Sequence, residues 1–110
     1  MTKQELKILL ANQCSSMAEL RAEIDRLDRA LVRLLSERQR YIERAAEIKS
    51  QRSDIRDRGR VEDVLAKVMA EAEQAGLDPG VARTVWQTLI ERSIELEFAA
   101  FDAKAQSGEG

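Results

Sequence analysis

The chain contains no histidine and a single cysteine, and both shortages exclude whole classes of chemistry. Without imidazole the protein cannot run Ser-His-Asp or Cys-His catalysis or bind a metal through histidine. The lone Cys14 can form neither an internal disulfide nor a structural zinc site, so nothing in the sequence requires an oxidising compartment. An enzyme made from this chain must therefore use carboxylates, arginine, lysine and hydroxyl groups.

Long apolar runs are also missing. No segment approaches the ~20 apolar residues that a membrane-spanning helix needs. Residues 1–5 lack the charged and then apolar build of a secretory signal. We therefore expect a cytoplasmic protein with no membrane partner.

Charge is nearly balanced over the whole chain but unevenly distributed. The net charge is −2 and no nucleic-acid-binding motif is present, so a nucleic-acid partner is not expected. Residues 20–60 nevertheless carry 12 basic against 8 acidic side chains, whereas residues 61–110 carry 4 against 10. The basic surplus in the first of these segments favours an anionic partner.

Apolar residues recur at spacings of four and three along the first half of the chain, which is the pattern of one helical stripe. The stripe comprises Leu20, Ile24, Leu27, Leu31, Leu34, Tyr41, Ala45 and Ile48. A helix over about residues 18–51 would span ~50 Å, whereas a compact domain of this size has a radius of gyration of only ~13 Å. The helix therefore overhangs any core that its own chain can build, and a homodimer is expected to cover the stripe.

Two more helices follow. A polar connection over residues 52–59 leads to a second apolar stripe that ends at Gly76, a typical helix stop. Asp78 and Pro79 have the pattern of an N-cap followed by the first residue of a third helix. The stripe of that helix comprises Val81, Val85, Trp86, Leu89, Ile90, Ile94 and Phe101. The sequence predicts an all-α, three-helix protomer, with residues 1–16 as an N-terminal extension, 17–103 as the helical domain and 104–110 as a disordered tail.

Several polar residues interrupt these apolar faces. Arg38 occupies the stripe position between Leu34 and Tyr41, and Glu97 lies near the inward face of the third helix. A charge on such a face is costly unless it is paired or solvated. One interpretation is a buried Arg38–Glu97 ion pair. The other is a buried pocket for a small polycarboxylate, to which Arg21, Lys49 and Ser93 also contribute.

These residues, in this order, resemble the all-helical class of chorismate mutases from Cys14 to Asp102. The leading element runs from Leu20 to Asp28 and continues to Arg38, with Lys49 eleven residues later. The segment Ile55-Arg56-Asp57-Arg58-Gly59-Arg60 follows, then Gly76-Leu77-Asp78, and finally Ser93 and Glu97. The resemblance implies an intertwined homodimer of three-helix protomers, chorismate as substrate, and no cofactor or metal.

The resemblance also implies a role for each site residue. Arg21 would reach a substrate carboxylate from the partner protomer, and Arg38 would hold a carboxylate from the same chain. Lys49 and Glu97 would both contact the ether oxygen of chorismate. The remaining substrate-binding residues would be Asp57 at the ring hydroxyl, with Arg60 and Ser93 at the ring carboxylate.

Two departures from the family pattern keep a related activity open. Val61 stands where the family often has a Glu, and the connection between Lys49 and Arg60 is one residue shorter than in the enteric mutases. Both features resemble isochorismate pyruvate lyases, whereas Glu97 and Asp57 favour a mutase that forms prephenate for phenylalanine and tyrosine biosynthesis. A non-catalytic helical dimerisation protein is the third alternative.

Overall fold

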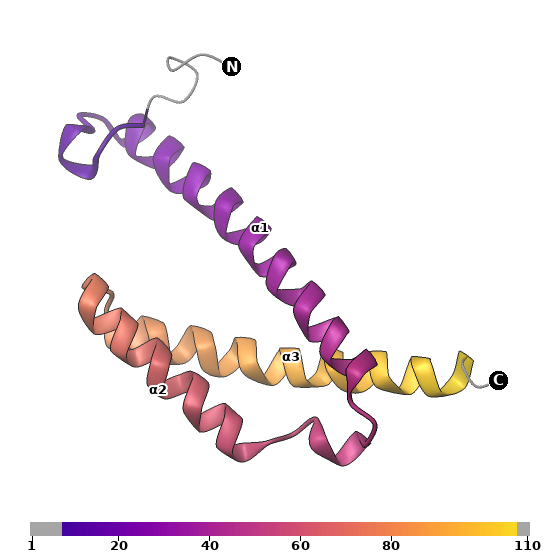
Figure 1. Ribbon diagram of the computed structural model, residues 1–110. Helices are drawn as coiled ribbons and strands as arrows, with labels where there is room; N and C mark the ends of the chain where they lie inside the picture. Colours follow the sequence, from indigo (N-terminus) through magenta and orange to yellow (C-terminus); the bar gives the residue numbers. More distant parts are fainter. Residues whose placement is uncertain (1–7, 108–110) are drawn as a thin grey trace. The chain divides into compact units, whose positions relative to one another are not determined.

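The computed structural model describes residues 8–107, in which there are three α-helices and no strand (Figure 1). The helices are α1 (Met17–Ile48), α2 (Arg58–Ala75) and α3 (Pro79–Ser107), and short 3₁₀ helices form at Ala11–Gln13 and Arg52–Asp54. The predicted all-α fold with a long N-terminal helix is confirmed. The predicted N-terminal extension, residues 1–16, lies outside the described residues at positions 1–7, and the predicted tail, residues 104–110, lies outside them at positions 108–110. At positions 104–107 the chain is still part of helix α3. The division of the chain at residues 16 and 103 stays a prediction.

The chain divides into two compact units, Met1–Arg38 and Gln39–Gly110. In the first unit, α1 begins after a reciprocal hydrogen-bonded turn. The Ser16 hydroxyl accepts a hydrogen bond from the Glu19 amide at 3.1 Å, and the Glu19 carboxylate accepts one from the Ser15 amide at 2.7 Å. This exchange satisfies amides that the first turn of a helix leaves without partners. The hydrogen bonds from Ser15 also lower the pKa of Glu19.

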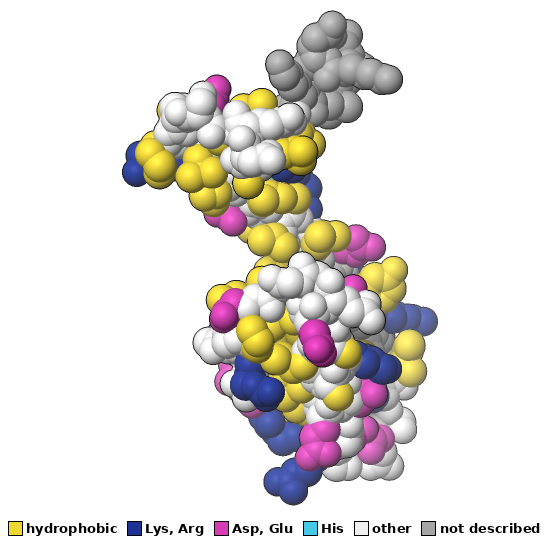
Figure 2. Space-filling model, turned by 90° about the vertical axis from the view of Figure 1, so that its left-hand side faces the viewer, with side chains coloured by type: hydrophobic (Ala, Val, Ile, Leu, Met, Phe, Trp, Pro, Cys, Tyr) yellow, Lys and Arg dark blue, Asp and Glu magenta, His cyan; other side chains and the backbone are white. Residues whose placement is uncertain are grey.

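The apolar stripe of α1 lies open along most of its length. Side chains at Ile24, Leu27, Leu31 and Leu34 are between 48% and 61% exposed. Figure 2 shows hydrophobic side chains gathered on the surface of the helix. Tyr41 and Ile48, at the stripe positions that fall in the second unit, are also exposed. Most of the apolar side chains of the stripe are therefore exposed in the described chain.

In the second unit, α2 and α3 pack side by side across a tight turn (Figure 1). Gly76 ends α2 in the left-handed conformation, with φ of 76°, and the Leu77 amide donates to the Ala72 carbonyl at 2.9 Å. A side chain at φ > 0 would be strained, which explains the glycine. Asp78 Oδ2 then accepts a hydrogen bond from the Val81 amide at 3.0 Å, and Pro79 is the first residue of α3. Both predicted helix boundaries are confirmed.

The core of this unit is a cluster of three buried isoleucines, Ile55, Ile90 and Ile94. Partly buried side chains from α2 and α3 pack against it: Val61, Val64, Leu65, Trp86, Phe98 and Phe101. Val81 and Val85 are about half exposed, so their predicted inward position is wrong for the single chain. Near the start of α3, Ala82 is fully buried, whereas the two valines lie on a face of the helix that is exposed to solvent.

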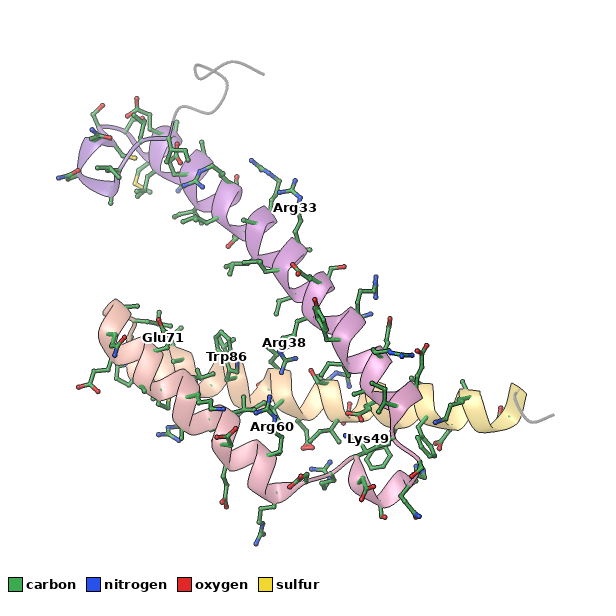
Figure 3. The ribbon with its side chains drawn as sticks, in the orientation of Figure 1. Arg33, Arg38, Lys49, Arg60, Glu71 and Trp86 are labelled. Atoms are coloured by element: carbon green, nitrogen blue, oxygen red, sulfur yellow. The ribbon has the colours of Figure 1, made fainter. Side chains whose placement is uncertain are left out.

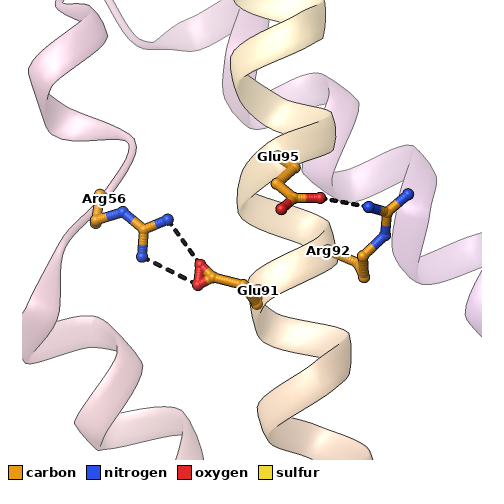
Figure 4. Close-up of polar contacts among 4 residues, drawn as sticks. All are labelled: Arg56, Glu91, Arg92 and Glu95. Atoms are coloured by element: carbon orange, nitrogen blue, oxygen red, sulfur yellow. Dashed lines mark hydrogen bonds and ion pairs between the residues drawn. The ribbon is translucent and has the colours of Figure 1, made fainter.

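Two ion pairs fasten the connection between α1 and α2 to α3. Arg56 donates two hydrogen bonds to the Glu91 carboxylate, at 2.7 and 3.2 Å (Figure 4). Arg52 bonds both carboxylate oxygens of Asp102, at 2.9 and 3.2 Å. Planar two-point contacts of this kind fix orientation better than single contacts. These contacts fix the position of the connection along α3, even though the ion pairs themselves are exposed.

These ion pairs predict an acid-dependent loss of stability. Hydrogen bonds from Arg56 and Arg52 lower the pKa of Glu91 and Asp102 in the folded chain. Because the unfolded carboxyls bind protons at higher pH, the stabilisation is present above their ordinary pKa of about 4 and is lost as the pH falls through the lowered values. The urea concentration at the midpoint of unfolding should therefore decrease as the pH is lowered from 6 to 3. In a Glu91→Gln/Asp102→Asn variant the midpoint should decrease less over this pH range than in the wild type. An equal decrease in the variant and the wild type would show that these two ion pairs do not cause the acid sensitivity.

Within residues 8–107, no helix is long and apolar enough to cross a membrane.

Candidate active site

Two of the predicted catalytic residues, Lys49 and Glu97, form an ion pair. Lys49 follows directly after the last residue of α1, and its amide still donates to the Ala45 carbonyl at 3.0 Å. Glu97 lies in the middle of α3 and is 5% exposed. Lys49 Nζ and Glu97 Oε2 are 2.6 Å apart. Helix packing thus joins a cation and an acid from distant parts of the sequence.

Glu97 lies in an environment that is expensive for a carboxylate. On α3 it follows the buried Ile94 and precedes Phe98, both of which belong to the apolar core. Removing a charge from water costs several kcal/mol, which a partner offsets only with good geometry. Although Lys49 Nζ is close, Glu97 Oε2 accepts no well-directed hydrogen bond, so this buried oxygen has unused acceptor capacity. Such a group in a folded protein calls for a functional explanation.

The backbone of Lys49 is also held in place. Lys104, on α3, donates from Nζ to the carbonyls of Ala46 at 2.9 Å and of Lys49 at 3.0 Å. Its ammonium lies 4.3 Å from the centroid of the Phe101 ring. Lys104 is not among the predicted site residues, because position 104 was expected to lie in the C-terminal tail. The available signal was the spacing of Glu97, Phe101 and Lys104, which places all three on one face of a continuing helix.

Asp57 and Arg60 meet at the start of α2. Asp57 is the N-cap, and its Oδ1 accepts a hydrogen bond from the Arg60 amide at 3.1 Å. The Arg60 guanidinium bonds Asp63 Oδ2 at 2.8 Å, and Lys67 bonds the same oxygen at 3.0 Å. Hydrogen bonds from Lys67 and Arg60 lower the pKa of Asp63. The cap gives Asp57 a structural role, and Arg60 is an exposed cation one turn into the helix.

The other predicted residues lie on two helices. Ser93 is half-buried on α3, one turn before Glu97 and on the same helical face. Arg21 is exposed and Arg38 is half-buried, and both belong to the part of α1 in the first unit. Figure 3 shows Arg38 along α1, Lys49 at its end and Arg60 near the start of α2. The structure joins Lys49 to Glu97 directly, and the role of Arg38 and its suggested pairing with Glu97 stay predictions.

A match to a known protein family shows the kind of enzyme to which the chain belongs. The family model for chorismate mutase type II matches residues 20–98, a span that contains all seven predicted site residues. The chain belongs to the chorismate mutase type II family. No curated protein is a significant match to the chain. The predicted enzyme, an isomerase that converts chorismate to prephenate, is confirmed by the family, and no observation favours the lyase or the non-catalytic alternative.

For a chorismate mutase, the position of Val61 is informative. This residue, which stands where the resemblance led us to expect a Glu, packs against the isoleucine core as a partly buried side chain. Its departure from the pattern is therefore accommodated as part of the apolar interior of this mutase. Among residues 8–107, no group of three or more His, Cys, Asp or Glu side chains is placed to hold a metal ion.

Proposed function

We propose that this chorismate mutase rearranges its substrate at a site centred on Lys49 and Glu97, within a homodimer whose partner contributes Arg21. The observation that carries the proposal is the buried pair itself. It places an ammonium and a carboxyl group within 2.6 Å of each other beside the apolar core. The reaction needs hydrogen-bond donors near one oxygen of the substrate, and this pair brings together two groups that can serve as such donors.

The reaction is pericyclic and exchanges no proton or electron with the protein. In one step the C–O bond to the enolpyruvyl arm breaks while a C–C bond forms across the ring. Partial negative charge develops on the ether oxygen in the transition state. Fixed donors that face this oxygen lower the barrier, because they stabilise charge that is smaller in the ground state. We assign one donor to Lys49 Nζ and the other to the carboxyl group of Glu97, which can donate a hydrogen bond only in its neutral form.

Orientation of the substrate is the second contribution. Chorismate carries two carboxylates, and holding both keeps the enolpyruvyl arm over the ring before the reaction begins. The arginine fork suits this task because it binds a carboxylate through two parallel hydrogen bonds. We assign one carboxylate to Arg38 and the partner's Arg21, and the ring carboxylate to Arg60 and Ser93. Asp57 is assigned to the ring hydroxyl.

The exposed stripe of α1 supports the homodimer. Six of its eight apolar side chains are about half exposed or more, and they continue along one face of a 32-residue helix. An apolar surface of this extent on a soluble domain marks an interaction site. A second copy is the simplest occupant, since an isologous interface pairs the same stripe with itself. Such pairing also brings Arg21 of the partner subunit to each site, while the cytoplasmic location stays a prediction.

The deciding experiment supplies chorismate and isochorismate separately to the purified protein. We expect rapid formation of prephenate from chorismate, above the uncatalysed rate in buffer, and no salicylate or pyruvate from isochorismate. Release of salicylate and pyruvate would identify a lyase. Failure to convert either compound would favour the non-catalytic dimerisation protein. Prephenate should also raise the melting temperature, because a ligand that binds only the folded state stabilises it.

A further inference from the structure

We infer that Lys104 is a positioning residue for the mutase reaction, because it fixes the backbone of Lys49 to the same face of α3 that holds the Lys49 side chain. This inference rests on the proposed function of Lys49 as a donor to the ether oxygen. It adds a residue from the C-terminal turns of α3 to the catalytic arrangement, although Lys104 itself does not face the reacting atoms.

The end of α1 lacks the usual means of termination. A helix leaves its last four carbonyls without amide partners, and many helices satisfy them through a glycine in the left-handed conformation. Gly76 does this for α2, but among residues 8–107 it is the only residue with a positive φ. The segment after α1 is Lys49-Ser50-Gln51, which contains no glycine. Termination of α1 must therefore come from elsewhere.

Lys104 provides this termination from 55 residues away. Its ammonium donates to the carbonyl of Ala46, within the last turn of α1, and to the carbonyl of Lys49 just beyond it. A cation at the C-terminal end of a helix is also favoured by the helix dipole. One side chain thus satisfies two carbonyls and stabilises the residue between helix and loop that carries the catalytic ammonium.

Lys49 is consequently held at two points by a single face of α3. Its Nζ contacts Glu97, and its carbonyl oxygen bonds Lys104, which lies seven residues or about two turns further along α3. Phe101 lies between them in sequence, and its ring supports the Lys104 ammonium. Because both anchors lie on one rigid helix, the distance from the Lys49 backbone to the Glu97 carboxyl is fixed by α3.

A neighbouring contact extends the same arrangement into the loop. Arg52, three residues after Lys49, bonds Asp102 and places its guanidinium 4.4 Å from the centroid of the Phe98 ring. This pair is exposed, so its contribution to stability is small. It nevertheless shows that the segment after Lys49 still contacts α3 at Arg52. Lys104 is the less exposed anchor and the one that bonds Lys49 directly.

Loss of Lys104 should therefore act on turnover more than on substrate affinity. The carboxylate-binding arginines stay in place when Lys104 is removed, so ground-state binding is preserved. Lys49, however, gains freedom at the end of α1, and a displacement near 1 Å is enough to cost about a hundredfold in rate. A purely structural lysine would lower the melting temperature and leave kcat of the folded fraction unchanged.

The test compares Lys104→Met with Lys104→Arg, and uses Lys67→Met as the matched control. Methionine keeps the length of the stem and its packing on Phe101 but removes the donors, whereas arginine keeps a cation with donors. Lys67 forms an exposed ion pair with Asp63 on α2, away from Lys49. If Lys104→Met does not fold, Lys104→Gln replaces it: its shorter, neutral side chain weakens both contacts with the end of α1, and a loss of kcat in the same direction but of smaller size is then expected. Two quantities are measured: kcat and KM with chorismate, and hydrogen exchange of the backbone amide of Lys49.

We expect Lys104→Met to lower kcat by about tenfold to a hundredfold with KM changed by less than about threefold. The Lys49 amide should exchange faster, Lys104→Arg should recover most of the lost turnover, and Lys67→Met should match the wild type. Unchanged exchange at Lys49, unchanged kcat, or an equal loss in Lys67→Met would overturn the inference. If the wild type converts chorismate and Lys49→Ala does not, a normal Lys104→Met refutes the positioning role alone. A wild type inactive on chorismate refutes the proposed function instead.

Discussion

Lys49→Ala is expected to lower kcat for the conversion of chorismate to prephenate by about a hundredfold to a thousandfold, the usual cost of deleting one oxyanion donor. The ammonium of Lys49 lies 2.6 Å from Glu97 Oε2, so the substitution removes a cation from the centre of the proposed site. KM should change less than kcat, because the carboxylate-binding arginines are intact. Steady-state kinetics with chorismate, corrected for the uncatalysed reaction, provides the measurement.

Two controls separate this effect from damage to the fold. Lys67→Ala removes an exposed lysine from α2 and should leave kcat unchanged. Lys49→Ala removes the ammonium that pairs with the buried Glu97, which costs about 3–5 kcal/mol of unfolding free energy, so circular dichroism and sedimentation must show a folded dimer. Turnover near that of the wild type in a folded Lys49→Ala protein would refute the site.

Mixing of two inactive proteins tests the assignment of Arg21 to the partner. In a heterodimer of Lys49→Ala and Arg21→Ala chains, one site lacks both residues and the other has both. Free exchange of subunits at equal concentrations makes half of the dimers mixed, so about a quarter of the wild-type activity should return. No recovery, despite subunit exchange shown by mass spectrometry, would place Arg21 outside the partner's site.

Glu97→Ala is expected to lower kcat for chorismate by about a hundredfold to a thousandfold, because it removes the second proposed donor to the ether oxygen. Glu97 is buried and makes an ion pair with Lys49, so the substitution acts at the centre of the proposed site. Steady-state kinetics with chorismate measures the loss.

Glu97→Gln should retain most of the turnover that Glu97→Ala loses, because an amide donates a hydrogen bond and brings no negative charge to the ether oxygen. Glu95→Gln is the control: Glu95 lies two residues away on α3, is exposed, and makes an ion pair with Arg92 (Figure 4). It should keep the kcat of the wild type. A Glu97→Ala protein that folds and turns over chorismate as fast as the wild type would exclude a donor role for Glu97.

The local features of the fold were accessible from the sequence because they depend on neighbouring residues. Gly76 ends α2 and Asp78 caps α3 as predicted, since a helix boundary depends on the φ angles and side chains of a few consecutive positions. The apolar spacing likewise predicted the long α1 and its open stripe. The same reasoning was wrong for Val81 and Val85, because periodicity identifies an apolar face without showing what covers it.

The sequence alone determined what kind of chemistry the protein can perform. It has no histidine and places lysine, arginine and carboxylate side chains on apolar faces, so any catalysis has to come from fixed charges and from orientation of the substrate. Only the tertiary structure decided which charges meet. It paired Glu97 with Lys49, gave Asp57 a capping role, and brought Lys104 to the end of α1. The physical reason is that helical periodicity determines only the face of the helix on which a side chain lies. Which residue it meets depends on the packing of α3 against the end of α1, which brings together residues that are 48 to 58 positions apart in the sequence.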